Sequence, residues 1–472
     1  MSRTSSSSLS WLEKAVLVHA ALLLLGASWI YGGNIWWMRV ALSCWATLGA
    51  GLTVTAFFQA GSRGRDARRK APWLIPLALF CGLVLLSAAN PSFRAVHIDG
   101  GTSYIQTGAA HPGWPSTIAP GLSLRSVWLG AGVYLSAFNL AAVLQSRSAL
   151  RGLLVLIASN TLALSVLGTV QKLAGSGFYF GAAHSPNIRF FATFIYYNHW
   201  GAFMILGLTT AAGLLFYHAR RHEGRDLWHS PFSLALLGVL LIATSAPVSA
   251  SRASTVIVAL VMGIAVAHAL VSVAARRRAR RQSAWQPLAL ILVLVLLTTG
   301  AIGWLSYRSI TERFTETRLA IDQDKSVFGG RAELYRDTWR LASRQPVFGW
   351  GLDTYAVGFQ MIRPFTVNLR DNTENVYATA HCDWLQSLAE TGFAGTGLII
   401  GMILAPLLAM PRRFVFHPLA AYPLLGCALV VLYAGVEFPF ANGAVLITFC
   451  LLFFTTLRHA QLTDLASRNR HE

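Results

Sequence analysis

The chain has 472 residues, of which 54% are hydrophobic and 12% are charged, and its mean hydropathy is +0.52. Soluble globular proteins carry about 25% charged residues, so this composition excludes an ordinary soluble enzyme. The five cysteines show no C-x-x-C spacing, which argues against a zinc ribbon and a thioredoxin-type site. The formal charge of +19 is of the kind seen in nucleic-acid-binding domains, but the long apolar runs leave little chain for a soluble basic face.

Long apolar runs along the chain predict transmembrane helices, since about 20 apolar residues cross a bilayer core. Backbone polar groups in lipid must be paired within the segment, so these runs are helices rather than strands. We therefore predict an all-α polytopic membrane protein with about twelve spans, near residues 15–31, 36–58, 73–89, 124–145, 152–171, 194–217, 232–248, 253–273, 287–306, 394–410, 417–435 and 443–457.

The positions of lysine and arginine predict the orientation of these spans, because cytoplasmic loops carry an excess of both. With the N-terminus inside, the inner segments hold 22 of the 38 basic residues. Both termini are therefore expected in the cytoplasm, and most of the positive charge is explained without nucleic acid. No small-residue cleavage site follows the first apolar run, so we expect that span to be retained.

Three units follow from this pattern. Residues 1–306 hold the first nine spans, residues 307–393 form a large periplasmic loop, and residues 394–472 hold the last three spans and a cytoplasmic tail. The loop contains 11 of the 19 acidic residues and 10 of the 38 basic residues. Long connections without regular structure are uncommon unless they are functional, so this loop is the expected location of a site.

Two helices are expected at the loop. Residues 331–344 predict an amphipathic helix that Arg331 opens and Pro346 ends. Its arginines at 336, 340 and 344 are expected to form a solvated or headgroup-facing row. A second helix, starting near His381, is expected to run without a break into the tenth span. The shorter outer segment 90–123 is rich in proline, glycine and aromatic residues and is interpreted as part of an interfacial aromatic belt.

Several short motifs in a fixed order resemble the O-antigen ligase and polymerase superfamily. The likeness extends over about residues 171–450, on twelve predicted spans with one large outer loop. The motifs are Gln171, Asn198-His199, Ser251-Arg252, Gly330-Arg331, Trp339, Pro346-Val-Phe-Gly-x-Gly351, Ala380-His381-x-x-Trp-Leu-Gln386, Ala389-Glu390-x-Gly392-x-x-Gly395 and Glu437-Phe-Pro. Two positions depart from the family pattern. Cys382 stands where the family commonly has Asn, and Tyr433 with Glu437 stands where it commonly has a His followed by an Asp.

The resemblance implies a glycosyltransferase of the bacterial inner membrane with its active site facing the periplasm. The implied donor is an undecaprenyl-diphosphate-linked glycan. The implied acceptor is the lipid A-core for a ligase, or another lipid-linked repeat unit for a polymerase. The family's functional residues fall on Arg252 and Arg331 for binding the diphosphate, and on His381 for assisting the acceptor hydroxyl.

The chemistry of these residues supports the same roles. A guanidinium binds a diphosphate bidentately without a metal, and a charge at the end of an apolar hairpin, as at Arg252, indicates a functional site. A histidine is suited to assist a hydroxyl at neutral pH. The candidate supporting residues are Glu390, His199, Arg189 and Glu437. Glu390 is expected to pair with an arginine and order the loop, and Glu437 is an alternative base.

No metal and no cofactor are expected. His381-x-Asp383 lacks further ligands at a recognisable spacing, and Asp322-x-Asp324 is interpreted as a solvated turn. The competing hypotheses are a twelve-span transporter or flippase, and a catalytically inactive scaffold. Transporters usually show repeated halves and polar residues near the midplane, whereas here the polar residues cluster at the outer ends.

Overall fold

A computed structural model describes most of the chain. The described residues are 9–98, 101–185, 187, 189–221, 230–286, 331–363, 367–368, 373–374, 377–412 and 417–469, with isolated positions between 288 and 307. The predicted ninth span at 287–306 lies largely outside this set, and so does the Asp322-x-Asp324 motif.

The described residues are mainly helical, with four short strands. The α-helices are α1 (Trp11–Trp29), α2 (Trp36–Phe58), α3 (Gly61–Arg69), α4 (Ile75–Ala89), α5 (Pro120–Val143), α6 (Arg147–Leu173), α7 (Tyr197–Arg221), α8 (Pro231–Val248), α9 (Arg252–Ala279), α11 (Arg331–Arg344), α12 (Tyr355–Gly358), α13 (Asp383–Leu408), α14 (Pro418–Tyr433) and α15 (Gly443–Arg468). Short 3-10 helices are η1 (Tyr31–Gly33), η2 (Ala71–Leu74), η3 (Phe178–Gly181), η4 (Phe359–Met361) and η6 (Pro439–Ala441). The strands form two antiparallel hairpins, β1 (Phe93–Ile98) with β2 (Gly101–Gln106), and β3 (Val367–Asn368) with β4 (Thr373–Glu374).

Within the described residues, ten helices are long and apolar enough to cross a membrane. They coincide with ten of the predicted spans. The predicted span at 417–435 corresponds to α14, which is apolar but has only 16 residues. A multi-pass helical membrane protein is therefore confirmed, and the total of twelve spans stays a prediction.

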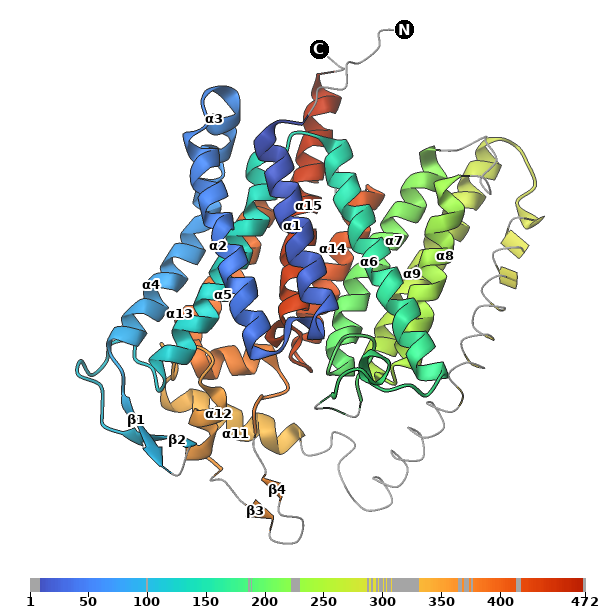
Figure 1. The fold of residues 1–472 in the computed structure, drawn as a ribbon. Coiled ribbons are helices and arrows are strands. Elements are labelled where there is room, and N and C mark those ends of the chain that lie inside the picture. Colours follow the sequence, from blue (N-terminus) through green and yellow to red (C-terminus); the bar gives the residue numbers. More distant parts are fainter. Residues whose placement is uncertain are drawn as a thin grey trace.

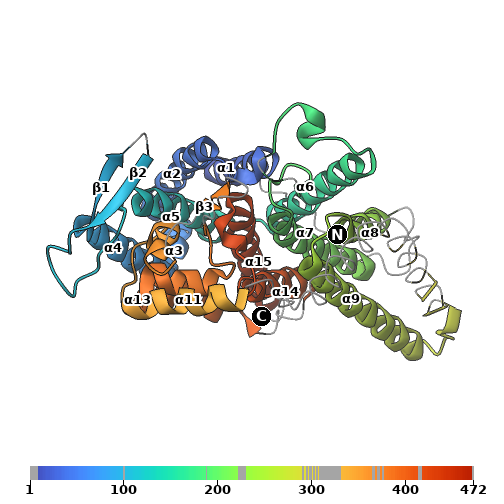
Figure 2. The same cartoon turned by 90° about the horizontal axis from the view of Figure 1, so that it is seen from below.

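The helices α7 and α15 form the centre of the bundle, because nearly all residues of their most apolar stretches are buried. Helices α5, α6 and α14 pack around them, and α8 and α9 lie on one outer side while α2, α4 and α13 lie toward the other (Figures 1 and 2). The start of α1, the end of α15 and the arginine-rich α3 lie at one end of the bundle. This grouping is the one that the positive-inside pattern predicts; which end faces the cytoplasm stays a prediction.

Helix α11 and the hairpin β1–β2 lie at the opposite end (Figure 1). Helix α11 has the predicted bounds, and its arginines 336, 340 and 344 are exposed. A second hydrophobic core holds this part together, with Leu334 and Leu341 of α11, Trp350, Phe359 and Phe93 among its buried members. The prediction for residues 90–123 missed the hairpin, because its strands alternate too briefly to give a clear period-2 signal.

The prediction of an unbroken helix from His381 into the tenth span is wrong. Gly392 interrupts α13 with φ 63° and ψ −170°. At the break, backbone N–H and C=O groups of α13 form hydrogen bonds with the loop at 346–351 instead of with the helix. Phe393 N donates to Pro346 O at 2.8 Å, and Gly351 N donates to Glu390 O at 2.7 Å. The Gly-x-Gly motif at 349–351 thus permits a close approach of two backbones, because a Cβ on Gly349 would lie 2.3 Å from the carbonyl carbon of Glu390.

Replacing Gly392 with Ala is expected to lower the free energy of unfolding by about 2 kcal/mol or more, because a Cβ would meet the Val347 carbonyl carbon at 2.3 Å and the positive φ is strained for any L side chain. Gly397→Ala in the same helix is the control. Its Cβ meets nothing within 4 Å, and alanine favours helix by up to ~1 kcal/mol over glycine. Thermal unfolding in detergent compares them, and equal midpoints for the two variants would contradict this explanation of the break.

Candidate functional site

The Glu437 carboxylate lies at the centre of the candidate site. It is 3% exposed, on the segment that joins α14 to α15. Its Oε1 accepts a hydrogen bond from Arg331 Nη2 at 2.5 Å and one from Asn198 Nδ2 at 2.9 Å. Its Oε2 is 3.7 Å from His381 Nδ1, an ion-pair distance that is too long for a hydrogen bond. Residues from three distant parts of the chain therefore meet at one carboxylate.

A hydrogen-bond network extends from Glu437 to the start of α9. Asn198, at the start of α7, accepts a bond from Ser251 Oγ at 2.7 Å, and Ser251 Oγ lies 2.8 Å from Ser254 Oγ. Ser251 directly precedes Arg252, the first residue of α9, whose side chain is exposed. The network therefore fixes the helix end that carries Arg252, while the guanidinium itself reaches solvent.

Aromatic rings enclose the carboxylate. Phe438 contacts His381 edge-to-face at 4.8 Å between ring centroids, contacts His199 edge-to-face at 5.0 Å, and stacks on Tyr196 at 5.4 Å. The Tyr196 hydroxyl accepts a bond from Asn198 Nδ2 at 2.8 Å. The pKa of Tyr196 is raised by burial and by the negative charge of Glu437, so this hydroxyl stays protonated.

The backbone presents His381 in a constrained position. Its φ is 51°, in the left-handed region that costs a non-glycine residue energy. Its carbonyl accepts a bond from the Tyr335 hydroxyl of α11 at 3.0 Å. The next residue, Cys382, caps α13, with its Sγ 3.4 Å from Leu385 N. The His381 side chain is 34% exposed, so it is open to a ligand.

The charge of Arg331 is secured by its surroundings. Burial alone lowers the pKa of the guanidinium, but the adjacent Glu437 carboxylate raises the pKa above its ordinary value overall. Arg331 Nη1 also donates to Val436 O at 3.1 Å. A guanidinium has five N–H donors. Two of its nitrogens thus hold the side chain in place, and the remaining donors of this one-third exposed group can bind an anion.

Several buried polar atoms at this site have no hydrogen-bond partner in the structure. They are Glu437 Oε2, His381 Nδ1, both ring nitrogens of His199 and the Tyr433 hydroxyl. Buried polar groups are normally paired, and each orphan calls for an explanation. Their convergence around Glu437 fits a place where the polar groups of a substrate complete the bonding.

Glu390 orders the loop as predicted, but not by pairing with an arginine. Its Oε2 accepts a bond from Asp353 N at 2.8 Å, and its Oε1 accepts bonds from Tyr355 N at 3.2 Å and Gln386 Nε2 at 3.0 Å. Among the residues that the structure describes, no arginine bonds to it. The Glu390 carboxylate is bound by backbone amides of the turn after Trp350, where we expected an arginine.

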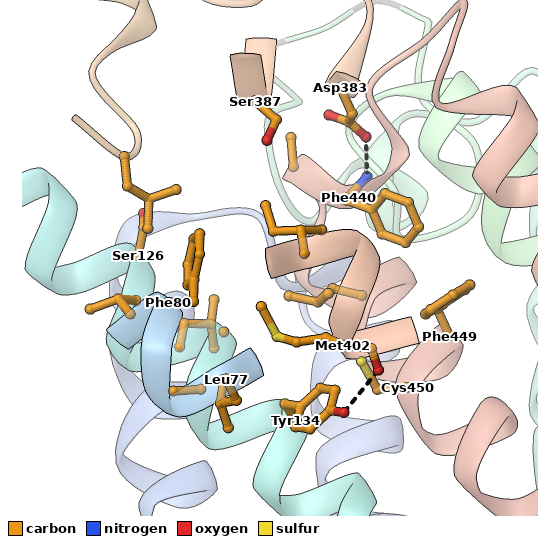
Figure 3. A pocket seen from close by; sticks show the side chains of 18 of the residues that line it. Leu77, Phe80, Ser126, Tyr134, Asp383, Ser387, Met402, Phe440, Phe449 and Cys450 are labelled. Carbon is orange, nitrogen blue, oxygen red and sulfur yellow. Dashed lines mark hydrogen bonds between the residues drawn. The ribbon is translucent and has the colours of Figure 1, made fainter. Parts of the chain in front are cut away.

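A cavity of about 330 Å³ lies beside the site, between α4, α5, α13 and α15. Figure 3 shows its apolar wall, which includes Leu77, Phe80, Met402 and Phe449. Asp383, Gln386 and Glu390 of α13 all line it, together with Trp384 and Ser387. Asp383 Oδ2 accepts a bond from Phe440 N at 2.8 Å (Figure 3). The cavity is thus separated from His381 and Glu437 by only a few residues of α13 and of the segment before α15.

The structure brings together four of the seven sequence-predicted candidates, namely Arg331, His381, His199 and Glu437. Arg252 is linked to them through Ser251. Arg189 is exposed, and its carbonyl accepts a bond from Tyr197 N at 3.1 Å, so it lies at the start of α7. Glu390 stands apart at the cavity.

Sequence reasoning missed several residues of the site. Asn198 appeared only as part of a motif, although an amide beside a conspicuous histidine is a recognisable signal. Phe438 could have been recognised in the same way, because it directly follows the candidate residue Glu437. Tyr335 and Tyr196 gave none, because their roles depend on contacts across more than 40 residues of chain.

The comparisons with known proteins agree with this arrangement. Residues 237–400 match the family model described as O-antigen ligase. This match supports membership of the O-antigen ligase superfamily. The matched range covers α9, α11 and most of α8 and α13, and therefore contains Arg252, Arg331 and His381. No curated protein matches the chain. Members of this superfamily are ligase- or polymerase-type glycosyltransferases, and that general class applies here.

Proposed function

We propose that this O-antigen ligase superfamily member moves a preassembled glycan from undecaprenyl diphosphate to an acceptor hydroxyl at the periplasmic face of the bacterial inner membrane. The observation that supports this most strongly is the meeting of Arg331, His381 and Glu437 beside polar atoms that lack partners. Arg331, which can bind an anion, and His381, which can accept a proton, both lie next to the Glu437 carboxylate. This arrangement suits glycan transfer from a diphosphate.

In this proposal the arginines bind the leaving group. The bond between the anomeric carbon and the diphosphate oxygen breaks, and its electron pair leaves with undecaprenyl diphosphate. Arg331, with Arg252 at the start of α9, neutralises the charge that develops there, which preorganised cations do effectively in a site with little water. No metal is needed for this step, because the guanidinium groups supply the positive charge.

His381 assists the acceptor. The acceptor oxygen forms the new bond to the anomeric carbon and loses its proton to His381 Nε2, because Nδ1 is buried and faces Glu437. Glu437, 3.7 Å away, orients the imidazole and stabilises its protonated form. Glu390 acts indirectly by fixing the loop at 351–355 against α13, and His199 and Arg189 support the start of α7.

The acceptor defines two versions of the proposal. A lipid A-core acceptor makes the protein a ligase, which is our first choice by family resemblance, and a second lipid-linked repeat makes it a polymerase. Purified protein given the donor with lipid A-core should join glycan to that acceptor. Longer lipid-linked chains formed without lipid A-core would instead identify a polymerase. Translocation of uncleaved donor would favour a flippase.

Replacing Arg331 with Lys is expected to lower transfer about 100-fold, because an ammonium cannot bind both the Glu437 carboxylate and a phosphate in the planar geometry of a guanidinium. The matched control is Arg336→Lys in the same helix, at an exposed position outside the site. Transfer by the control should stay within twofold of wild type. Equal rates for the two variants in the same detergent would contradict the assignment of Arg331 to the diphosphate.

A further inference from the structure

The end of the bundle at which α1 begins and α15 ends has two groups of basic residues, and they differ in their ion pairing. In the first group every cation has an acidic partner. Arg458 donates to Asp66 Oδ2 at 2.8 Å, Lys70 donates to Asp66 Oδ1 at 2.7 Å, and Arg63 lies 3.7 Å from Glu13. This group joins α1, α3 and α15 and is structural.

The second group has no such partners. It comprises Arg147 and Arg151, one turn apart at the start of α6, and Arg220 near the end of α7. Arg151 and Arg220 contact rings: the Arg151 guanidinium lies 5.5 Å from the Tyr217 ring centroid, and Arg220 Nη2 lies 3.5 Å from His268 Nε2. Within the part of the chain that the structure describes, none of the three arginines forms an ion pair with a carboxylate.

Histidines continue the same group between the helices. His417, the residue before α14, lies 6.3 Å from the Tyr217 ring and 5.9 Å from the ring of His459 on α15. Arg147 and Arg151 lie near His459, and Arg220 lies near His417. Cations and proton-binding rings from α6, α7, α9, α14 and α15 therefore surround one place.

This place is recessed relative to the ends of the neighbouring helices. With 16 residues, α14 extends about 24 Å at ~1.5 Å per residue, which is less than the ~30 Å of a hydrocarbon core. Its outer end is fixed near Glu437. Its other end contacts Tyr217, four residues before α7 ends, and His268, eleven residues before α9 ends. Arg147, Arg151 and Arg220 thus lie at helix ends beside the end of α14, which stops short of the ends of α7 and α9.

We propose that Arg147, Arg151 and Arg220 bind the phosphate headgroup of an anionic phospholipid of the membrane in this recess. Basic pockets between transmembrane helices suit such headgroups, and guanidinium groups bind phosphate bidentately. The half-buried positions of Arg147 and Arg151 and the exposed position of Arg220 leave the group open to a headgroup from the bilayer. The inference does not depend on the proposed transferase activity.

Native mass spectrometry of the full chain in detergent tests this, with dioleoylphosphatidylglycerol and dioleoylphosphatidylcholine as probes. The wild type is expected to bind the anionic lipid at least about tenfold more tightly than the neutral one. The triple variant Arg147→Gln, Arg151→Gln, Arg220→Gln is expected to lose this preference. The control Arg65→Gln, Arg69→Gln, Arg277→Gln removes the same charge elsewhere at this end of the bundle and is expected to keep it.

Two results would overturn the proposal: an equal loss of lipid preference in both triple variants, or an unchanged preference in the first. The variant with Lys at all three positions keeps the charge and is expected to retain most of the binding. Photolabelling of the wild type with a photoreactive phosphatidylglycerol provides a measurement that needs no variant. Labels are expected on α6, α7 and α14 near these arginines, and labels confined to other helices would contradict the site.

Discussion

Replacing Glu437 with Gln is expected to lower glycan transfer about 100-fold and to lower the free energy of unfolding by roughly 1–3 kcal/mol. The amide keeps the shape of the side chain but not its charge. Arg331 then loses its only carboxylate partner among the described residues, and an imidazolium at His381 loses the group that stabilises it. Because Arg331 is one-third exposed, water offsets part of the cost, which keeps the stability loss modest.

Transfer rates and thermal unfolding in detergent measure the two effects separately. Glu333→Gln is the control, because Glu333 also pairs with an arginine, Arg363, but its side chain is 66% exposed and it lies outside the site. This control is expected to change neither quantity appreciably. A Glu437→Gln variant that transfers glycan at the wild-type rate would remove Glu437 from the proposed mechanism.

The second large effect is expected at His381. Replacing it with Gln should lower the turnover number between 10²- and 10⁴-fold, the range that general-base catalysis contributes. The apparent affinity for the donor should change little, because Arg331 and Arg252 bind the diphosphate. Glutamine can still donate and accept hydrogen bonds, so a purely structural histidine would tolerate this change far better than a proton-accepting one.

His111→Gln is the matched control, since His111 is an exposed histidine on the outer segment before α5. Its activity should match wild type. Both variants should also keep their thermal midpoints, which excludes unfolding as the cause of any loss. If the turnover of His381→Gln fell only as far as that of His111→Gln, Glu437 would become the better candidate for the base.

Much of the membrane fold could be predicted from the sequence, because apolar length and the distribution of arginine are properties of single segments. The bounds of α2 and α11 were predicted to the residue. The break at Gly392 was missed, because the sequence there continues a helical pattern and only the backbone of residues 346–351 makes a break favourable. The short strands β1 and β2 were missed because neither gives a clear alternation.

The sequence predicted which residues form the site better than it predicted how they are arranged. Arg331 and His381 stood out because each lies in a motif, at or just before the start of a helix. Their meeting at Glu437, which is 106 residues after Arg331, is a tertiary contact that no spacing encodes. Glu390 illustrates the converse: we expected an arginine partner for this acidic residue, but backbone amides of the neighbouring turn bind it.

The most direct test of the proposed function is a transfer assay with purified wild-type protein in detergent, an undecaprenyl-diphosphate-linked glycan and lipid A-core, with EDTA present throughout. The proposal predicts glycan covalently joined to the acceptor, together with one undecaprenyl diphosphate released per transfer. Folded protein that leaves the donor uncleaved, with either lipid A-core or a second lipid-linked glycan as acceptor, would contradict it.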